Sequence, residues 1–173
     1  EGTGDIVPWP MIVKEELTKS YGENVFQVFI KSYGKMNSNE VIDSNAHEEV
    51  AALQPDILLI EPFILNDNGY TKMKDTLYHL DLLIRTVEIV NPNVIVMIQP
   101  PNPIYQAEYY LDQVNQLEKY SADEDIIYLN HWEEWPDVTD EKLLQYLDET
   151  KLMPNQEGHT LWAEYISQYF INK

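Results

Sequence analysis

Four short apolar runs along the chain predict buried β-strands. Their apolar residues follow one another almost without interruption, whereas a half-exposed strand would alternate apolar and polar positions. Continuous runs are typical of strands that are covered on both faces and therefore run parallel. The runs occupy residues 25–30, 57–62, 94–99 and 126–129.

Segments with helical periodicity separate these runs. Their apolar residues recur at the spacing that places them on one face of a helix. The expected helices cover residues 9–21, 38–53, 72–90, 104–120, 142–147 and 157–170. Helices that alternate with buried strands predict a three-layer α/β fold, αβα, around a parallel sheet. The 173 residues have the usual length of one domain, so we expect a single domain over residues 1–173.

The first expected helix has no strand before it. A right-handed crossover through that helix to the strand at residues 25–30 needs an earlier strand in the same sheet. The residues before the helix read instead as a loop, "EGTGDIVPWP". We therefore expect the first strand of the fold to be missing from this sequence.

Polar residues and glycines follow the predicted strands. In open parallel sheets, ligands bind beyond the carboxyl ends of the strands, so we expect these residues to gather at one edge and to meet a ligand. The alternative is that asparagine, aspartate and glycine only form turns there. The candidates are Ser32, Gly34, Asn66, Asp67, Asn102, Asn130, His131 and Trp132.

Charge and composition exclude several classes of function. The formal net charge of −19 argues against nucleic acids and anionic membranes as partners, because both would repel the chain. The absence of cysteine excludes disulfides, thiolate metal sites and a cysteine nucleophile. No apolar run approaches the roughly 18 residues of a membrane span. We expect no metal and no cofactor, since the acidic run at residues 123–125 lacks an EF-hand pattern and no glycine-rich phosphate loop is visible.

Three stretches of the sequence are similar to motifs of a known family. They read "FIKSYGKMNSNEVI", "ILLIEPFILNDNGY" and "MPNQEGHTLWAEYI". They resemble the second, third and last sequence blocks of the SGNH (GDSL-like) hydrolases, which are serine esterases and acyl hydrolases with a flavodoxin-like three-layer fold. The resemblance covers most of the chain. It implies that Gly34 and Asn66 are oxyanion-hole residues, and that Pro154, Asn155, Gly158 and His159 lie in the frame of the last block.

The sequence departs from the family pattern at several positions. Ile64 stands where the third block usually has a glycine. Met153 stands where the family places its catalytic histidine, and Thr150 where it places the partner aspartate. The block with the nucleophilic serine would precede Glu1, so no serine of this sequence is assigned as the nucleophile.

The resemblance implies acyl transfer by a serine and a histidine base, with the oxyanion held by Gly34 and Asn66. His159 is the first candidate for the base, because Trp162 and Ile166 place it on the inward face of the last helix, whose N-terminus should lower the histidine pKa. His131, which follows a strand, is the second candidate. The remaining two histidines, at positions 47 and 79, are expected to be solvated.

Substrate contacts are assigned to Asp67, Asn102 and Trp132, although Asp67 has an alternative role as a loop anchor that accepts backbone N–H groups. Trp132, Trp135 and Tyr33 either form a platform for sugar rings or are ordinary core and surface aromatics.

The sequence therefore predicts a serine hydrolase for ester or O-acetyl groups of a small molecule or of a carbohydrate or cell-envelope polymer. A bacterial extracellular or envelope location is expected, and a cytoplasmic one otherwise. The alternative is an inactive SGNH-like domain that binds a polysaccharide or a protein. A third hypothesis, a flavodoxin-like nucleotide binder, requires a phosphate loop upstream.

Overall fold

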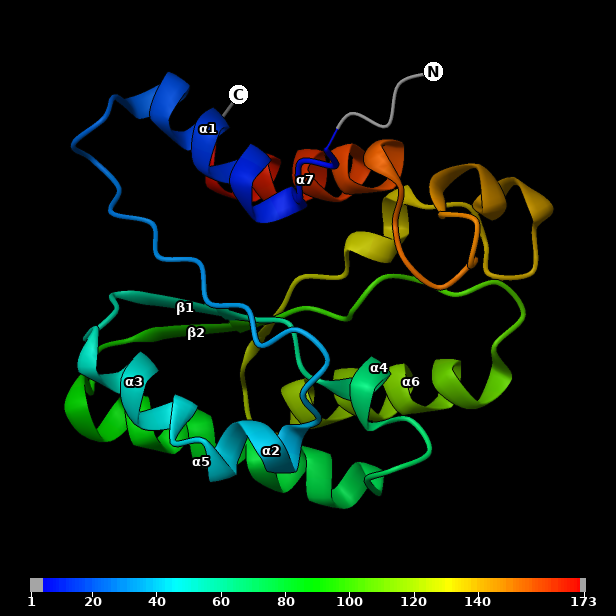
Figure 1. Cartoon of the computed structure of the whole chain (residues 1–173). Helices are drawn as coiled ribbons and strands as arrows, with labels where there is room; N and C mark the ends of the chain where they lie inside the picture. Colours follow the sequence, from blue (N-terminus) through cyan, green and yellow to red (C-terminus); the bar gives the residue numbers. More distant parts are fainter. Residues whose placement is uncertain (1–4, 172–173) are drawn as a thin grey trace. The chain divides into compact units, whose positions relative to one another are not determined.

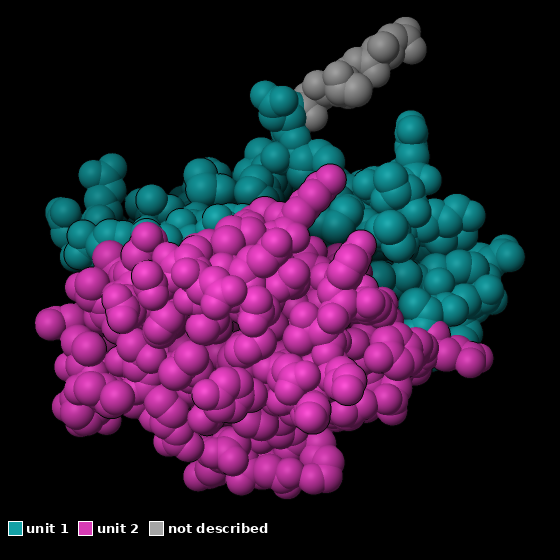
Figure 2. Space-filling view, turned by 60° about the horizontal axis from the view of Figure 1, so that its bottom comes forward, with its two compact units in different colours: residues 1–32, 102–107, 131–173 teal, residues 33–101, 108–130 magenta. Residues whose placement is uncertain are grey.

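The computed structural model describes residues 5–171, and their contacts divide the chain into two units (Figure 2). Unit 1 consists of Glu1–Ser32, Asn102–Ala107 and His131–Lys173, and unit 2 consists of Tyr33–Pro101 and Glu108–Asn130. Neither unit is a continuous stretch of sequence, so no single boundary separates them along the chain. The expectation of one domain over residues 1–173 stays a prediction.

A parallel sheet of three strands forms the centre of unit 2. The strands are β1 (Ile57–Ile60), β2 (Ile95–Ile98) and β3 (Ile127–Tyr128), in the order β1-β2-β3. Both pairings are parallel. The parallel sheet and three of the four predicted strands are therefore confirmed.

Burial increases along the strands toward their carboxyl ends. The first residues of the three strands are exposed, whereas Ile60 and Ile98 at the ends of β1 and β2 are buried. Gln99, the next residue after β2, is also buried. The carboxyl end of the sheet, where ligand-binding loops are expected, is thus the more enclosed end.

Five helices complete unit 2, and in Figure 1 they lie on one side of β1 and β2. Among them, α2 and α3 both pack on the long helix α5, and α6 contacts β3. Their bounds are α2 Ser38–Asp43, α3 Ala46–Ala52, α4 Ile64–Asp67, α5 Met73–Val90 and α6 Glu108–Asp123.

Three helices of unit 2 differ from the sequence prediction. The helix expected over residues 104–120 begins and ends later, as α6. The helix expected over residues 38–53 is broken into α2 and α3, because Asn45 takes a left-handed conformation (φ 62°) and Ser44 Oγ donates to the carbonyl of Val41. Asparagine and serine favour such turns over a helix interior. The polar loop expected around Asn66 begins instead inside a short helix, α4, whose residue Asp67 donates its N–H to the Phe63 carbonyl.

The predicted strand at residues 25–30 is wrong. This segment has no regular secondary structure, and Val25 and Phe29 are exposed. A strand is stable only when its N–H and C=O groups find a neighbouring strand. Among the described residues, 5–171, no strand pairs with this segment, so its apolar composition alone does not produce a strand.

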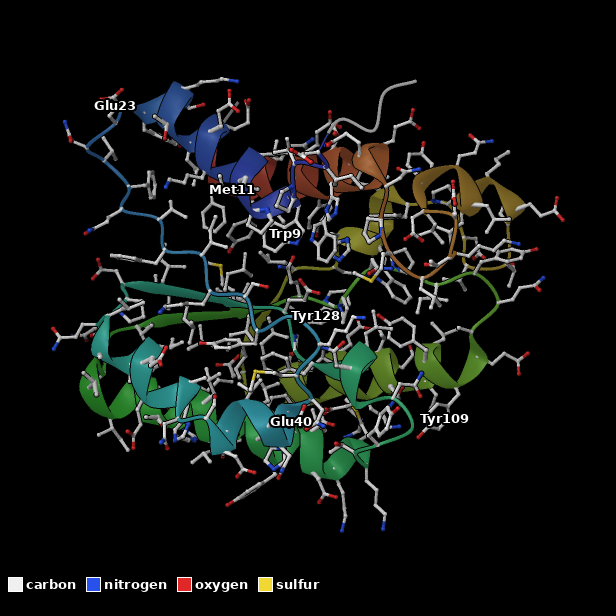
Figure 3. The ribbon with its side chains drawn as sticks, in the orientation of Figure 1. Trp9, Met11, Glu23, Glu40, Tyr109 and Tyr128 are labelled. Carbon is white, nitrogen blue, oxygen red and sulfur yellow. The ribbon has the colours of Figure 1, made fainter. Side chains whose placement is uncertain are left out.

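Unit 1 is built on two parallel helices, α1 (Trp9–Tyr21) and α7 (Gln156–Phe170). Their starts are joined by Val7, whose N–H donates to Gln156 Oε1 at 2.8 Å. Their ends are joined by the hydroxyl of Tyr21, which donates to the Phe170 carbonyl at 2.7 Å. Between these contacts the ring of Trp9, labelled in Figure 3, stacks on the ring of Trp162.

The other helical segments of unit 1 are short 3₁₀ turns, η1 (His131–Glu134) and η2 (Glu141–Tyr146), and both contact α7. The helix expected over residues 142–147 is therefore a 3₁₀ helix. The start of α1 and the end of α7 agree with the prediction. No helix among the described residues is both long and apolar enough to cross a membrane.

Asn155 and Gly158, two residues of the last sequence block, have structural roles at the start of α7. Asn155 is the N-cap, and its side chain accepts the N–H of Gly158 at 3.0 Å while its amide donates to the carbonyls of Gln145 and Leu147. Gly158 lies against η2 so closely that a Cβ would come within 2.3 Å of the Tyr146 carbonyl oxygen. This oxygen is held in place because it also accepts the Asn155 N–H.

We predict that Gly158→Ala destabilises the protein by about 1–3 kcal/mol, the usual cost of overpacking. Alanine normally stabilises a helix relative to glycine by up to about 1 kcal/mol, but the clash with a fixed backbone oxygen outweighs that gain. Urea denaturation of the two proteins measures the difference. The control is Glu157→Ala, an exposed neighbour in the same turn, which should change the free energy of unfolding by no more than about 0.5 kcal/mol. A Gly158→Ala variant as stable as this control would contradict the packing argument.

Candidate active site

The two predicted oxyanion residues meet in unit 2. Asn66, in α4, donates through Nδ2 to the carbonyl of Gly34 and to the carbonyl of Met36, each at 2.9 Å. Gly34 has a φ of 58° and stands second in a turn that Met36 closes by donating its N–H to the Tyr33 carbonyl at 3.1 Å. Glycine favours this left-handed conformation because it has no Cβ. The amide of Asn66 therefore fixes the turn that contains Gly34.

Asp67, the next residue, holds the same loop at its other end. Its side chain is fully buried. One carboxylate oxygen accepts the backbone N–H of Ser38 at 2.7 Å, and the other accepts the hydroxyl of Thr76. A buried carboxylate is tolerated only when such donors satisfy it. The anchoring role considered for Asp67 is thus observed, and its enclosed carboxylate offers no surface to a substrate in this structure.

Asn102 in unit 1 is enclosed in a similar way. Its side chain is buried, and Nδ2 donates to the carbonyls of Pro103 and Leu152, at 3.1 and 2.9 Å. Both amide hydrogens are used within the protein. The amide of Asn102 therefore secures two loop segments of unit 1, and the predicted substrate contact has no free donor from this amide.

His131 is part of the core of unit 1. Its ring is fully buried and stacks on Trp162 with the ring centres 4.1 Å apart. Its Nδ1 accepts the indole N–H of Trp135 at 3.0 Å. A neutral imidazole that accepts at Nδ1 carries its proton on Nε2. His131 is therefore arranged as a hydrogen-bonded core residue.

His159 is half-buried near the start of α7, and its Nδ1 accepts the backbone N–H of Trp9 at 3.3 Å. Burial lowers the pKa of this histidine from its ordinary value. The lowered pKa that the sequence predicted is confirmed, although the cause is burial, where the prediction invoked the helix N-terminus. The ring is neutral at pH 7 and, in this arrangement, holds its proton on Nε2.

Two of the positions that depart from the family pattern, Thr150 and Met153, lie in one turn of unit 1. The Thr150 hydroxyl donates to Asp148 Oδ1 at 2.5 Å, and the Thr150 N–H donates to the same oxygen at 3.0 Å. Burial acts to raise the pKa of Asp148, but these bonds and the N–H groups of Leu152 and Met153 lower it overall. The Met153 side chain is exposed. Neither position 150 nor 153 carries an acid or a base.

The aromatic residues considered for a sugar platform have different surroundings. Trp135 is buried and donates to His131, so it belongs to the core of unit 1. Trp132, next to His131, is half-buried. Tyr33 is half-buried in unit 2, where its ring meets Phe63 edge-on. Trp135 is therefore an ordinary core aromatic, and Trp132 stays partly exposed.

The predicted site residues are divided between the units. Gly34, Asn66 and Asp67 belong to unit 2, and the structure brings these three together around one loop. The histidine candidates, with Asn102 and Trp132, belong to unit 1. Among residues 5–171, no three histidine, aspartate or glutamate side chains are placed to hold a metal ion.

One side-chain contact near these residues was missed by the sequence analysis. His79 on α5 was expected to be solvated, and this is wrong: Nδ1 of His79 lies 2.8 Å from the hydroxyl of Ser38. The sequence carried no signal for this contact, because Ser38 and His79 lie 41 residues apart on different helices. His47, the other histidine expected to be solvated, is half-buried on α3.

Comparison with solved structures identifies the fold. A G-D-S-L family protein from Desulfitobacterium hafniense DCB-2 is 17% identical and matches with a TM-score of 0.74 over 93% of this chain and 87% of that one. The chain has the fold of the SGNH hydrolases. A carbohydrate esterase of family 3 from Talaromyces cellulolyticus matches with a TM-score of 0.72 at 14% identity, over 95% of this chain and 90% of that one. An acetyl-xylooligosaccharide esterase from a Geobacillus species matches with a TM-score of 0.66 at 15% identity, over 100% of this chain and 86% of that one.

No protein-family model and no curated protein sequence matches the chain. The SGNH fold is therefore recognised from its structure and from the three sequence blocks. It confirms the fold class predicted from the sequence. The block expected to hold the nucleophile lies outside the described residues.

We predict that His159 makes stability depend on pH. Because burial lowers its pKa below the ordinary value of 6.5, the unfolded chain binds a proton more readily than the folded protein does as the pH falls through about 6.5. The free energy of unfolding should therefore decrease between about pH 7 and pH 5.

The variant His159→Asn isolates this contribution. Asparagine places an oxygen near the position of Nδ1 and can accept the Trp9 N–H without titrating. Urea denaturation across this pH range should show a steeper loss for the wild-type protein than for the variant. Parallel pH profiles would show that His159 titrates alike in the folded and unfolded chains.

Proposed function

We propose that the protein is a serine hydrolase of the SGNH type that removes O-acetyl or related ester groups from carbohydrates. Two solved structures with the same fold carry the names of a carbohydrate esterase and an acetyl-xylooligosaccharide esterase. The observation that carries the proposal is the contact between Gly34 and Asn66, which lie 32 residues apart. By resemblance these two hold the oxyanion positions of the family, and they meet on one loop.

In the proposed reaction, a serine attacks the ester carbonyl and His159 accepts its proton, which then passes to the leaving alcohol. Water, which gives a proton to the same histidine, then attacks the acyl-serine, and the acid leaves as the serine regains its proton. The Gly34 N–H and the Asn66 amide stabilise the oxyanion, and one such donor is typically worth about 2.7–4 kcal/mol. The lowered pKa of His159 keeps its ring neutral at pH 7, as a base requires. For Nε2 to accept a proton, the neutral ring must carry hydrogen on Nδ1, so the contact with the Trp9 N–H has to open first.

The charge of the protein narrows the substrate. With a formal net charge of −19, the chain repels acidic polymers. An uncharged or cationic acetylated glycan therefore suits the proposal better than an anionic one.

A second candidate function is binding of a carbohydrate without catalysis. Two observations favour it: positions 150 and 153 carry threonine and an exposed methionine in place of the family's aspartate and histidine, and Nδ1 of both His131 and His159 accepts a hydrogen bond within unit 1. In this case, the loop over residues 34–38, here called the Gly34 loop, would contact a glycan that is left unchanged.

Hydrolysis by the full-length protein distinguishes the two functions. We expect release of acetate from p-nitrophenyl acetate and from acetylated xylo-oligosaccharides, and covalent labelling of one serine by a fluorophosphonate, with mass spectrometry identifying that serine. His159→Ala should abolish turnover, and His47→Ala should leave it unchanged. If the folded protein binds acetylated glycan but neither reacts with the probe nor releases acetate, the hydrolase proposal is refuted and the protein is a binding domain.

The role of Asn66 is tested by removing its amide. Asn66→Ala should lower kcat by about 10²-fold or more, the usual effect of losing an oxyanion donor. Asn68→Ala is the matched control, because this half-buried asparagine two residues away stands just beyond α4 and is not part of the contact with Gly34. Equal kcat values for the two variants would remove Asn66 from the proposed mechanism.

A further inference from the structure

Four polar side chains of unit 2 form a network behind the Gly34 loop. Asp67 accepts the backbone N–H of Ser38 and the hydroxyl of Thr76. Ser38 places its own hydroxyl 2.8 Å from Nδ1 of His79. The residues come from α2, α4 and α5, so the network ties three helices to the end of one loop.

Ser38 is the centre of this network. It is the first residue of α2, and only 2% of its surface is exposed. Its backbone is held by Asp67 on one side, and its side chain by His79 on the other. The residue before it, Asn37, forms a capping box with Glu40, which is labelled in Figure 3. Two independent sets of bonds thus fix the point where the loop enters α2.

A serine hydroxyl in contact with an imidazole also resembles a nucleophile and its base. The surroundings exclude that role. Ser38 is buried, with only 2% of its surface exposed, which leaves little room for a substrate carbonyl at its hydroxyl. The carboxylate of Asp67 binds the Ser38 backbone and Thr76, whereas a catalytic triad would use it to orient the imidazole. The pair therefore serves to hold the loop.

We propose that His79 is a positioning residue for the Gly34 loop and acts through Ser38. The loop over residues 34–38 is held at the Gly34 and Met36 carbonyls by Asn66 and at Ser38 by Asp67 and His79. Each bond reduces the conformations that the loop can adopt before it binds a ligand. Hydrogen-bond donors stabilise an oxyanion best when they are fixed in advance, so the catalytic part of this inference rests on the proposed hydrolase function.

The first test measures the loop directly and does not depend on activity. Amide hydrogen exchange at position 38 and at Met36, whose N–H groups donate to Asp67 and to the Tyr33 carbonyl, should accelerate by roughly fivefold to tenfold in Ser38→Ala and in His79→Ala, as expected for the loss of one hydrogen bond. The double variant should add little, because both changes remove the same contact. His79→Asn, which places a polar atom near the position of Nδ1, should restore much of the protection. Lys74→Ala, which changes an exposed residue in the first turn of α5, is the control.

The second test measures catalysis. If the protein is a hydrolase, His79→Ala should lower kcat with KM nearly unchanged, and His79→Asn should recover most of the loss, although neither residue touches the substrate. A general loss of stability would not be rescued in this way.

The outcomes separate this inference from the proposed function. Faster exchange in a protein that has no esterase activity would refute the hydrolase and leave the positioning role of His79 intact. Unchanged exchange at position 38 and at Met36 in both His79→Ala and Ser38→Ala, with the protein folded, would overturn the inference. If His79→Ala is unfolded and Ser38→Ala is folded, the exchange rates of Ser38→Ala test the inference. This variant removes only the hydroxyl and keeps the backbone N–H that Asp67 binds.

Discussion

The bonds from Asn66 and Asp67 to the loop over residues 34–38 are the constraint on which the candidate site in unit 2 depends. Helix α4, which carries both residues, has only four residues and would not be stable in isolation. Its side chains supply donors to one end of the loop and acceptors to the other. The helix and the loop therefore stabilise each other, and neither takes its position without the other. This explains why an amide and a carboxylate stand in the short helix after an apolar strand: they join the segment that follows β1 to a loop that comes earlier in the chain.

In unit 1, aromatic residues that were candidates for a functional site are packed into the core. Trp162 stacks on Trp9 and on His131, so three rings form one continuous stack in the core of this unit. Trp135 donates its indole N–H to His131 and closes the stack from the side. A buried imidazole needs a hydrogen-bond partner, and the indole provides it. The histidine thus contributes to packing as an aromatic ring and to polar satisfaction as an acceptor.

The sequence predicted the features that depend on neighbours along the chain. Periodicity located α1 and three strands, and the resemblance to the sequence blocks of the SGNH family led to Gly34 and Asn66, which do meet. Features that depend on distant partners were not visible. The apolar segment at residues 25–30 has the composition of a strand, but no described strand pairs with it. The contact between Ser38 and His79 joins residues 41 apart on different helices, and no spacing rule reports it. The split of the predicted helix at Asn45 could have been predicted in part. Ser44 and Asn45 favour a turn, but the helical periodicity of the apolar residues around them favoured one continuous helix.

The two candidate functions require different hydrogen bonds from the side-chain amide of Asn66. A side-chain amide has two hydrogens, and both are bonded to the carbonyls of Gly34 and Met36. A hydrolase that uses this amide must exchange one of these bonds for a bond to the oxyanion. Hydrogen bonds to a charged oxygen are roughly twice as strong as neutral ones, so the exchange is favourable only once the charge has developed. That is the requirement for catalysis, because only an interaction that is stronger in the transition state accelerates the reaction. A binding domain would keep both bonds while its ligand is in place, and the loop would stay as it is in the free protein.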